Sequence, residues 1–347
     1  MPDVDVVVIG AGAMGSAAAW QLARRGRSVA LIEQFEAGHR RGSSHGATRI
    51  FRIAYRDPTY VALAVEALRC WRELEADSGE VLLEQSGQLD HGSPDAIEQI
   101  ATNLETAGYV ADRMTPEAAE RRWPHLRFDR AVVHSADGGR VFADRTVAAL
   151  QRRAAELGVD VSFSEPVLGI ERTGSGATVR TVRRELNARC AVVAAGAWVR
   201  GLVPTDVALP ELVVTEEVPV HFRPRDPSWR WPSFVHHVDG TAGALVFGAY
   251  GLESPGEGVK VGVEAATGVD DVIAYVRRWH PGLDPTPVSS TVCLFTSTPD
   301  EHFIVERHGP VVVCSPCSGH GFKFTPVIGE LVADLCDGIA PRYRFAG

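Results

Sequence analysis

The chain of 347 residues is longer than one hydrophobic core usually supports, so its length favours two closely joined domains. Its composition, with 45% hydrophobic and 23% charged residues, is that of a globular protein and excludes a disordered chain. The formal net charge of -9 argues against nucleic acid as a partner, because binding to phosphates needs a clustered cationic surface.

The chain carries no pattern of a secreted or membrane protein. Residues 1–9 lack the basic segment and cleavage site of a signal peptide, and no apolar run approaches the roughly 20 residues that span a bilayer. We therefore expect a cytoplasmic location and no membrane partner. The six cysteines are scattered without a disulfide framework, and Cys314 and Cys317 lack the second pair that would complete a metal site. We expect no metal.

The first predicted elements are a strand, a glycine turn and a helix. Residues 5–9 (DVVVI) form a short run that is apolar and β-branched after Asp5; Gly10, Gly12 and Gly15 follow it, and residues 16–25 have a helical pattern. Gly10 permits the tight turn, Gly12 lets backbone approach a pyrophosphate, and Gly15 lets the helix pack closely on the strand. This spacing predicts a dinucleotide site.

The second strand supports the same site. The strand predicted over residues 28–32 is followed by Glu33, 18 residues after Gly15. A carboxylate at this position can bind ribose hydroxyls and would repel a 2'-phosphate. The fingerprint alone does not choose FAD from NAD, because both present an ADP moiety to such a unit.

The middle of the chain alternates helical and strand-like segments. Residues 58–77 predict an amphipathic helix whose apolar stripe packs in the core. Thr115 has the position of an N-cap before Pro116, and residues 146–157 predict another helix. Residues 204–288 consist of short β-rich segments, which we assign to a substrate domain. Near the C-terminus the order of strand, glycine loop and helix returns, so the first domain is discontinuous.

Four separated segments are specific enough to indicate a family. In order and spacing they resemble the monomeric sarcosine oxidase and N-methyltryptophan oxidase family, and the resemblance covers nearly the whole chain. The segments are the glycine fingerprint, residues 42–52 (GSSHGATRIFR), residues 293–303 (CLFTSTPDEHF) and residues 318–324 (SGHGFKF).

The resemblance implies FAD as the cofactor and an α/β fold, α+β overall. A Rossmann-like FAD-binding domain would be joined to a second, mainly antiparallel-sheet substrate domain. We assign the FAD-binding domain to residues 1–85, 134–203 and 300–347. The substrate domain takes residues 86–133 and 204–299.

The resemblance also implies which residues hold the cofactor. A cysteine at the position of Cys293 bonds the flavin 8α-methyl carbon in this family, and a thiolate is well suited to attack an electrophilic carbon. An inert buried cysteine is the alternative. Further cofactor contacts are expected from Gly10, Gly12, Gly15, Glu33, Ser44, Thr48, Gly319, His320 and Gly321.

Three cationic or ionisable residues, His45, Arg49 and Lys260, resemble those placed around the flavin ring in the family. Lys260 matches the lysine that activates oxygen. A fixed positive charge in a pocket of low dielectric stabilises superoxide, the first product of oxygen reduction. The alternative for Lys260 is a surface lysine on a glycine loop.

Arg52 and Lys323 match the pair that holds the substrate carboxylate in the family. Arginine offers a planar fork and lysine a point charge, so the two together can orient an amino acid. The alternative is that either one is a solvated surface charge.

The chain departs from the sarcosine-specific pattern at several pocket positions. Glu264 stands where a histidine is expected, Phe247 and Phe295 where tyrosines are usual, and Asp57 replaces a glutamate. We hypothesise that Glu264 faces the substrate amine and selects a bulkier or more basic amino acid than sarcosine, because a buried acid needs a cationic partner.

The sequence therefore predicts a monomeric FAD-dependent oxidase of a small secondary amino acid, either N-methyl or cyclic. It would take the amino acid and molecular oxygen and give an imine and hydrogen peroxide. Two alternatives stay open. One is a flavin dehydrogenase of a related amine or hydroxy acid with a non-oxygen acceptor, and the other is a non-catalytic FAD-binding subunit.

Overall fold

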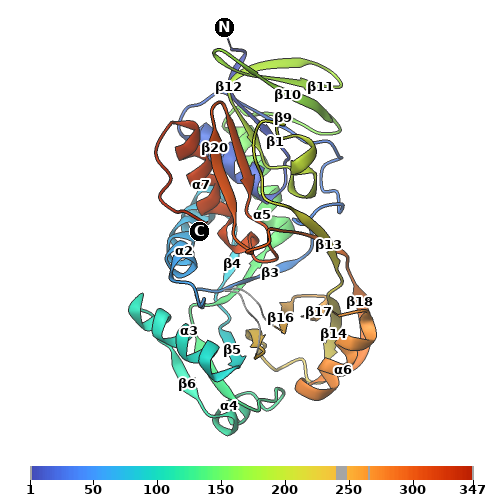
Figure 1. Ribbon diagram of the computed structural model, residues 1–347. Coiled ribbons are helices and arrows are strands. Elements are labelled where there is room, and N and C mark those ends of the chain that lie inside the picture. Colours follow the sequence, from blue (N-terminus) through green and yellow to red (C-terminus); the bar gives the residue numbers. More distant parts are fainter. Residues whose placement is uncertain (1, 240–247, 265, 346–347) are drawn as a thin grey trace.

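The computed structural model describes residues 2–239, 248–264 and 266–345, and two eight-stranded sheets dominate it. Figure 1 shows these sheets at opposite ends of an elongated molecule, with the N-terminal strand in the upper one and strand β5 in the lower one. No helix among the described residues is long and apolar enough to cross a membrane.

The first sheet is built on parallel strands, as the glycine fingerprint predicts. Parallel pairing joins β9 (Asp160–Ser162), β2 (Val29–Ile32), β1 (Val4–Ile9), β12 (Glu185–Val193) and β21 (Val311–Ser315), in this order. Strands β20 (Ile304–His308), β10 (Val167–Thr173) and β11 (Gly176–Thr181) extend it in antiparallel pairing. Apolar residues on both faces of β1 are buried, as is typical of a parallel sheet covered on both sides.

Helices cover one face of this sheet. Helix α1 packs against two others, α5 and α7, and α2 also contacts α7. Their apolar faces form one large core with alternate residues of β1. The bounds are α1 (Ala13–Arg24), α2 (Pro58–Ser78), α5 (Ala143–Glu156) and α7 (Thr325–Cys336), with short 3-10 turns η1 (Gly196–Gly201) and η2 (Phe322–Phe324).

The second sheet is antiparallel except for the pair β15 and β5. Helices α3 (Pro94–Thr106), α4 (Pro116–Arg122) and α6 (Val269–Trp279) accompany it. The strand order is β18 (Leu283–Ser290), β14 (Val220–Pro224), β17 (Gly258–Val263), β16 (Ala249–Ser254), β15 (Ser233–His237), β5 (Gln88–Gly92), β7 (Ala131–Ser135) and β6 (Asp112–Met114).

Two small sheets complete the fold. Strands β3 (Thr48–Phe51), β8 (Gly139–Phe142) and β4 (Leu83–Glu84) form one, and β13 (Val213–Glu217) and β19 (Cys293–Ser297) form the other. The first residue of β19 is Cys293, and β3 carries Thr48 and Arg49. Residues expected at the cofactor therefore come from these short strands between the large sheets.

The α/β fold with a Rossmann-like sheet and a mainly antiparallel second sheet is confirmed. The helix predicted over residues 58–77 is found as α2, and Asp57 is its N-cap, since the carboxylate accepts from the Thr59 N–H at 2.7 Å. Thr115 caps α4 by accepting from the Ala118 N–H at 3.3 Å. The capping side chains satisfy amide groups that have no partner within the helix.

Candidate active site

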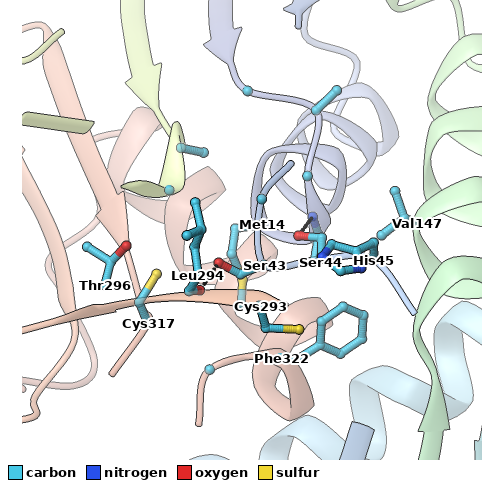
Figure 2. A pocket seen from close by; sticks show the side chains of 18 of the residues that line it. Met14, Ser43, Ser44, His45, Val147, Cys293, Leu294, Thr296, Cys317 and Phe322 are labelled. Carbon is cyan, nitrogen blue, oxygen red and sulfur yellow. Dashed lines mark hydrogen bonds between the residues drawn. The ribbon is translucent and has the colours of Figure 1, made fainter. Parts of the chain in front are cut away.

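A cavity of about 980 Å³ runs from the glycine turn of the first sheet to the inner face of the second. Residues of the glycine turn line one end, and Val235, Tyr250, Leu252 and Lys260 of the second sheet line another part. Figure 2 looks into this cavity, where Ser43, on the segment before β3, lies against Leu294 of β19. The volume and the extended lining suit a large cofactor together with a small substrate.

The glycine turn is so tight that side chains cannot replace its hydrogens. A Cβ on Gly10 would lie 2.5 Å from the Ala194 carbonyl oxygen, and the φ of Gly10 is +98°. A Cβ on Gly12 would lie 2.9 Å from Ser44 Oγ, which accepts from the Ala13 N–H at 3.0 Å. The backbone at the start of α1 is thus open toward the cavity, as an approaching pyrophosphate requires.

Gly15 lies behind this turn, and we expect Gly15→Ala to destabilise the protein. Its Cβ would stand 1.8 Å from the Gly10 carbonyl oxygen, so strand and helix must separate. The expected loss is about 3 kcal/mol in unfolding free energy, with weaker FAD retention. Urea unfolding and flavin absorbance check both. Gly169→Ala is the control, since open space surrounds Gly169; equal effects of the two variants would contradict the packing role.

Glu33 lies at the end of β2, as predicted, and it is buried. One carboxylate oxygen accepts from the Ala11 N–H at 2.8 Å, and the other accepts from the Phe35 N–H at 3.0 Å. These bonds hold the carboxylate at the cavity wall, where it can also accept from ribose hydroxyls.

Arg49 brings three predicted residues together. Its guanidinium donates to the His45 carbonyl at 2.7 Å and to Cys293 Sγ at 3.5 Å. Burial and the nearby Arg49 charge lower the pKa of His45, which favours the neutral imidazole. The guanidinium also lies 5.8 Å from the Phe322 ring centroid, and Figure 2 shows Phe322 close to Cys293. The sulfur therefore lines the cavity beside a fixed positive charge.

Lys260 is a buried cavity-lining residue of β17, not a surface lysine. Its ammonium group donates to the Thr48 carbonyl at 2.5 Å. Burial, with a smaller contribution from the Arg49 charge, lowers the pKa of Lys260 to about 7. Near neutral pH both the charged and the neutral form of Lys260 are therefore populated, whereas an exposed lysine stays protonated.

Arg52 and Lys323 also line the cavity, although 271 positions separate them, and they are 4% and 5% exposed. The Arg52 guanidinium stacks on the Tyr55 ring at 4.2 Å, and the Lys323 ammonium lies 5.5 Å from the same ring. Burial and the Arg52 charge hold the pKa of Lys323 well below its usual range. A carboxylate between the two cations would relieve their repulsion.

The closing loop supplies further predicted cavity residues, namely Gly319, His320, Gly321 and, from β19, Phe295. A Cβ on Gly319 would meet the Phe295 ring at 2.8 Å, and a Cβ on Gly321 would meet the Pro316 carbonyl at 1.7 Å. His320 is buried between Tyr55, whose hydroxyl is 3.4 Å from Nδ1, and the Glu301 carbonyl. Burial lowers the pKa of His320 well below its usual range, so the imidazole is neutral.

Besides Gly15, which lies behind the glycine turn, three predicted site residues are not found in the cavity wall. Thr48 is buried behind it, and its carbonyl holds Lys260 and Arg49, so Thr48 supports the site from outside. Glu264 is exposed and, among the described residues, does not line the cavity, because β17 ends at Val263 and the chain turns there. The structure therefore does not bring Glu264 to the described wall of the cavity, where the sequence places it. Phe247 lies outside the described residues.

The sequence reasoning missed Tyr250, Cys314 and Cys317, which line the cavity. Tyr250 pairs with Gly262 and Leu252 with Lys260, so strand alternation places Tyr250 on the inner face with Lys260. Burial raises the pKa of the Tyr250 hydroxyl and keeps it protonated. The C-x-x-C pair lies in the wall, and burial raises the pKa of Cys317 to about 11. No group that could hold a metal ion is found among the described residues.

Comparison with known proteins identifies the family. The model of the FAD dependent oxidoreductase family matches residues 5–335. The chain belongs to this family. It is 33% identical to the monomeric sarcosine oxidase of Streptomyces avermitilis, over 96% of this chain and 94% of that protein. It is also 33% identical to the human peroxisomal sarcosine oxidase, over 99% of this chain and 94% of that protein.

A solved structure agrees with the family assignment. NikD, described as an unusual amino acid oxidase essential for nikkomycin biosynthesis, superimposes with a TM-score of 0.85 at 27% identity, covering 98% of this chain and 95% of NikD. The cavity of this FAD-dependent oxidoreductase fits the cofactor. The open glycine turn suits the pyrophosphate, Glu33 suits the ribose, and the rest of the cavity extends to Cys293 and Lys260.

Proposed function

We propose that this flavoenzyme oxidises the carbon–nitrogen bond of a small secondary amino acid, either N-methyl or cyclic, to an imine and produces hydrogen peroxide. The observation that carries the proposal is the pair of buried cations, Arg52 and Lys323, in the same cavity as Lys260. Two cations withdrawn from water need an anion, and the carboxylate of an amino acid supplies one. The names of the sarcosine oxidase relatives and of NikD support an amino acid substrate.

The residues of the chain bind, orient and shield the substrate. Arg52 and Lys323 hold its carboxylate, so the substrate nitrogen and the adjoining carbon point along the cavity toward Lys260 and Cys293. Val235, Tyr250 and Leu252 form a wall that excludes water on the inner face of the second sheet. When bound, FAD supplies the acceptor for the hydride and the route of the electrons to oxygen. Lys260 supplies the positive charge that stabilises the superoxide anion.

We also propose that FAD is covalently attached through Cys293. Cys293→Ser is expected to release all flavin on acid precipitation, because a serine hydroxyl is a far weaker nucleophile than a cysteine sulfur. Absorbance of the pellet and the supernatant measures this. Cys317→Ser is the matched control, since Cys317 also lines the cavity, and its pellet should stay yellow as in the wild type. A colourless wild-type pellet would contradict the attachment.

A peroxide-release screen over N-methyl and cyclic amino acids tests the activity. Peroxide from at least one secondary amino acid is the expected result, with Arg52→Ala raising the KM of that substrate. Flavin bleaching without peroxide would favour a dehydrogenase, and no bleaching with any amine would favour a non-catalytic subunit.

We further propose a monomer, the state named for the Streptomyces avermitilis relative. Gel filtration of the FAD-loaded chain tests it.

A further inference from the structure

A buried carboxylate lies directly beside Arg52, one of the two proposed substrate cations. Asp90 of β5 is 0% exposed, and its Oδ1 lies 3.6 Å from Arg52 Nη1. The same oxygen is 2.8 Å from His237 Nε2, and Oδ2 accepts from the Gln88 side-chain amide at 3.2 Å. A carboxylate with these contacts has its position fixed by the protein.

The register of the second sheet explains how Asp90 reaches this place. Asp90 pairs with Val235 in the parallel ladder between β5 and β15, so both side chains project from the same face. Val235 lines the cavity, whereas Asp90 does not line it among the described residues. Asp90 therefore acts on a ligand only through Arg52, which lies between the carboxylate and the cavity.

The charges at this end of the cavity can be counted. With a carboxylate bound between them, Lys323 is held in its protonated form, so Arg52 and Lys323 contribute two positive charges, while Asp90 contributes one negative charge close to Arg52. Among the described residues, Asp90 is the carboxylate paired with Arg52. One net positive charge remains, and it matches a single carboxylate. A second carboxylate on the substrate would enter a region of low dielectric without a counter-charge.

We propose that Asp90 is a positioning residue that offsets half of the Arg52–Lys323 charge and thereby restricts the site to amino acids with one carboxylate. The inference rests on the proposed function, since it takes the two cations as the carboxylate site. It goes beyond that function by excluding a substrate class, the N-substituted amino dicarboxylates.

The test compares ligands with one and with two carboxylates. Acetate and malonate are titrated into the oxidised FAD-loaded enzyme by calorimetry, and peroxide release is measured with sarcosine and iminodiacetate. Asp90→Asn is expected to raise the malonate-to-acetate affinity ratio, and the iminodiacetate-to-sarcosine ratio of kcat/KM, by about tenfold, because the charge of Arg52 is then no longer offset and can balance a second carboxylate. Asp90→Glu, which keeps the charge, should leave both ratios within about twofold of wild type.

Matched controls separate charge from structure. Asp77→Asn removes a carboxylate that pairs with Arg153 outside the cavity, and it should leave the ratios unchanged. If Asp90→Asn does not fold, Asp90→Ser is titrated with the same ligands. The inference would be overturned if Asp90→Asn left both ratios unchanged, or if it weakened the binding of both ligands equally, as a purely structural role predicts. A wild-type enzyme that binds neither acetate nor malonate would overturn it as well. The titrations need no turnover, so a chain that binds acetate but releases no peroxide contradicts the proposed function alone.

Discussion

Replacement of Lys260 by methionine is expected to slow oxygen consumption by the substrate-reduced enzyme by about 100- to 1,000-fold, the usual effect of removing one preorganised electrostatic contact. Methionine has a similar length and no charge, so the buried position stays filled. The anaerobic reduction of the enzyme by the amino acid should change far less, because Arg52 and Lys323 are intact. Stopped-flow mixing with aerated buffer measures the first rate, and anaerobic mixing with substrate measures the second.

The pH dependence of the same rate provides an independent check. Burial lowers the pKa of Lys260 to about 7, so the fraction of the charged form falls as the pH rises through this value. The wild-type rate with oxygen should therefore be high below pH 7 and decline above it. The arginine in Lys260→Arg keeps its charge at every accessible pH. This variant should therefore react with oxygen at the wild-type rate at low pH, without the decrease in rate above pH 7. A Lys260→Met enzyme that reacts as fast as wild type would exclude this role.

Local signals in the sequence predicted much of the fold. The glycine fingerprint specifies strand, turn and helix within 15 positions, because a Cβ on Gly10 or Gly15 meets backbone atoms. Capping residues such as Asp57 likewise act on groups two or three positions away. A strand, turn and helix followed by another strand connect the two strands in parallel by a right-handed crossover, and few other connections are possible. Units of this kind therefore predict a parallel sheet.

The site was harder to predict wherever it depends on pairing between distant strands. Tyr250 and Asp90 face inward because of their registers with β17 and β15, and no local pattern contains that register. Glu264, which the sequence places at the substrate through the resemblance alone, lies in the turn just after the end of β17, and no local pattern specifies where that strand ends. Thr48 belongs to the correct motif but contributes its carbonyl oxygen from behind the wall.

A buried group of histidines on the outer face of the second sheet leads to a prediction on stability. His91 of β5 and His236 of β15 stack with ring centroids 4.2 Å apart. His280 lies 4.6 Å from the Phe234 ring, and His125 lies 4.4 Å from the Trp231 ring, measured between centroids. All four histidines are less than 9% exposed. Burial among aromatic rings disfavours the charged imidazolium form, so these side chains stay buried at low cost only while they are neutral.

Burial lowers the pKa of His125 and of His236 to about 4 and that of His280 to about 3. The unfolded chain binds these protons near pH 6.5, whereas the folded chain does not. The contribution of these neutral histidines to the free energy of unfolding is therefore complete above about pH 6.5, and it is lost as the pH falls toward 4. At pH 5 each of these histidines should remove about 2 kcal/mol from the free energy of unfolding.

We expect the urea midpoint of the FAD-loaded enzyme to fall steeply between pH 7 and pH 5, and His280→Phe to reduce this fall by about 2 kcal/mol in unfolding free energy. Phenylalanine fills a similar space and binds no proton, and the Phe234 ring beside it is compatible with an aromatic neighbour. His308→Gln, at the half-buried end of β20, is the control that should leave the profile unchanged. If His280→Phe lost as much stability as wild type over this range, the acid sensitivity would not come from His280.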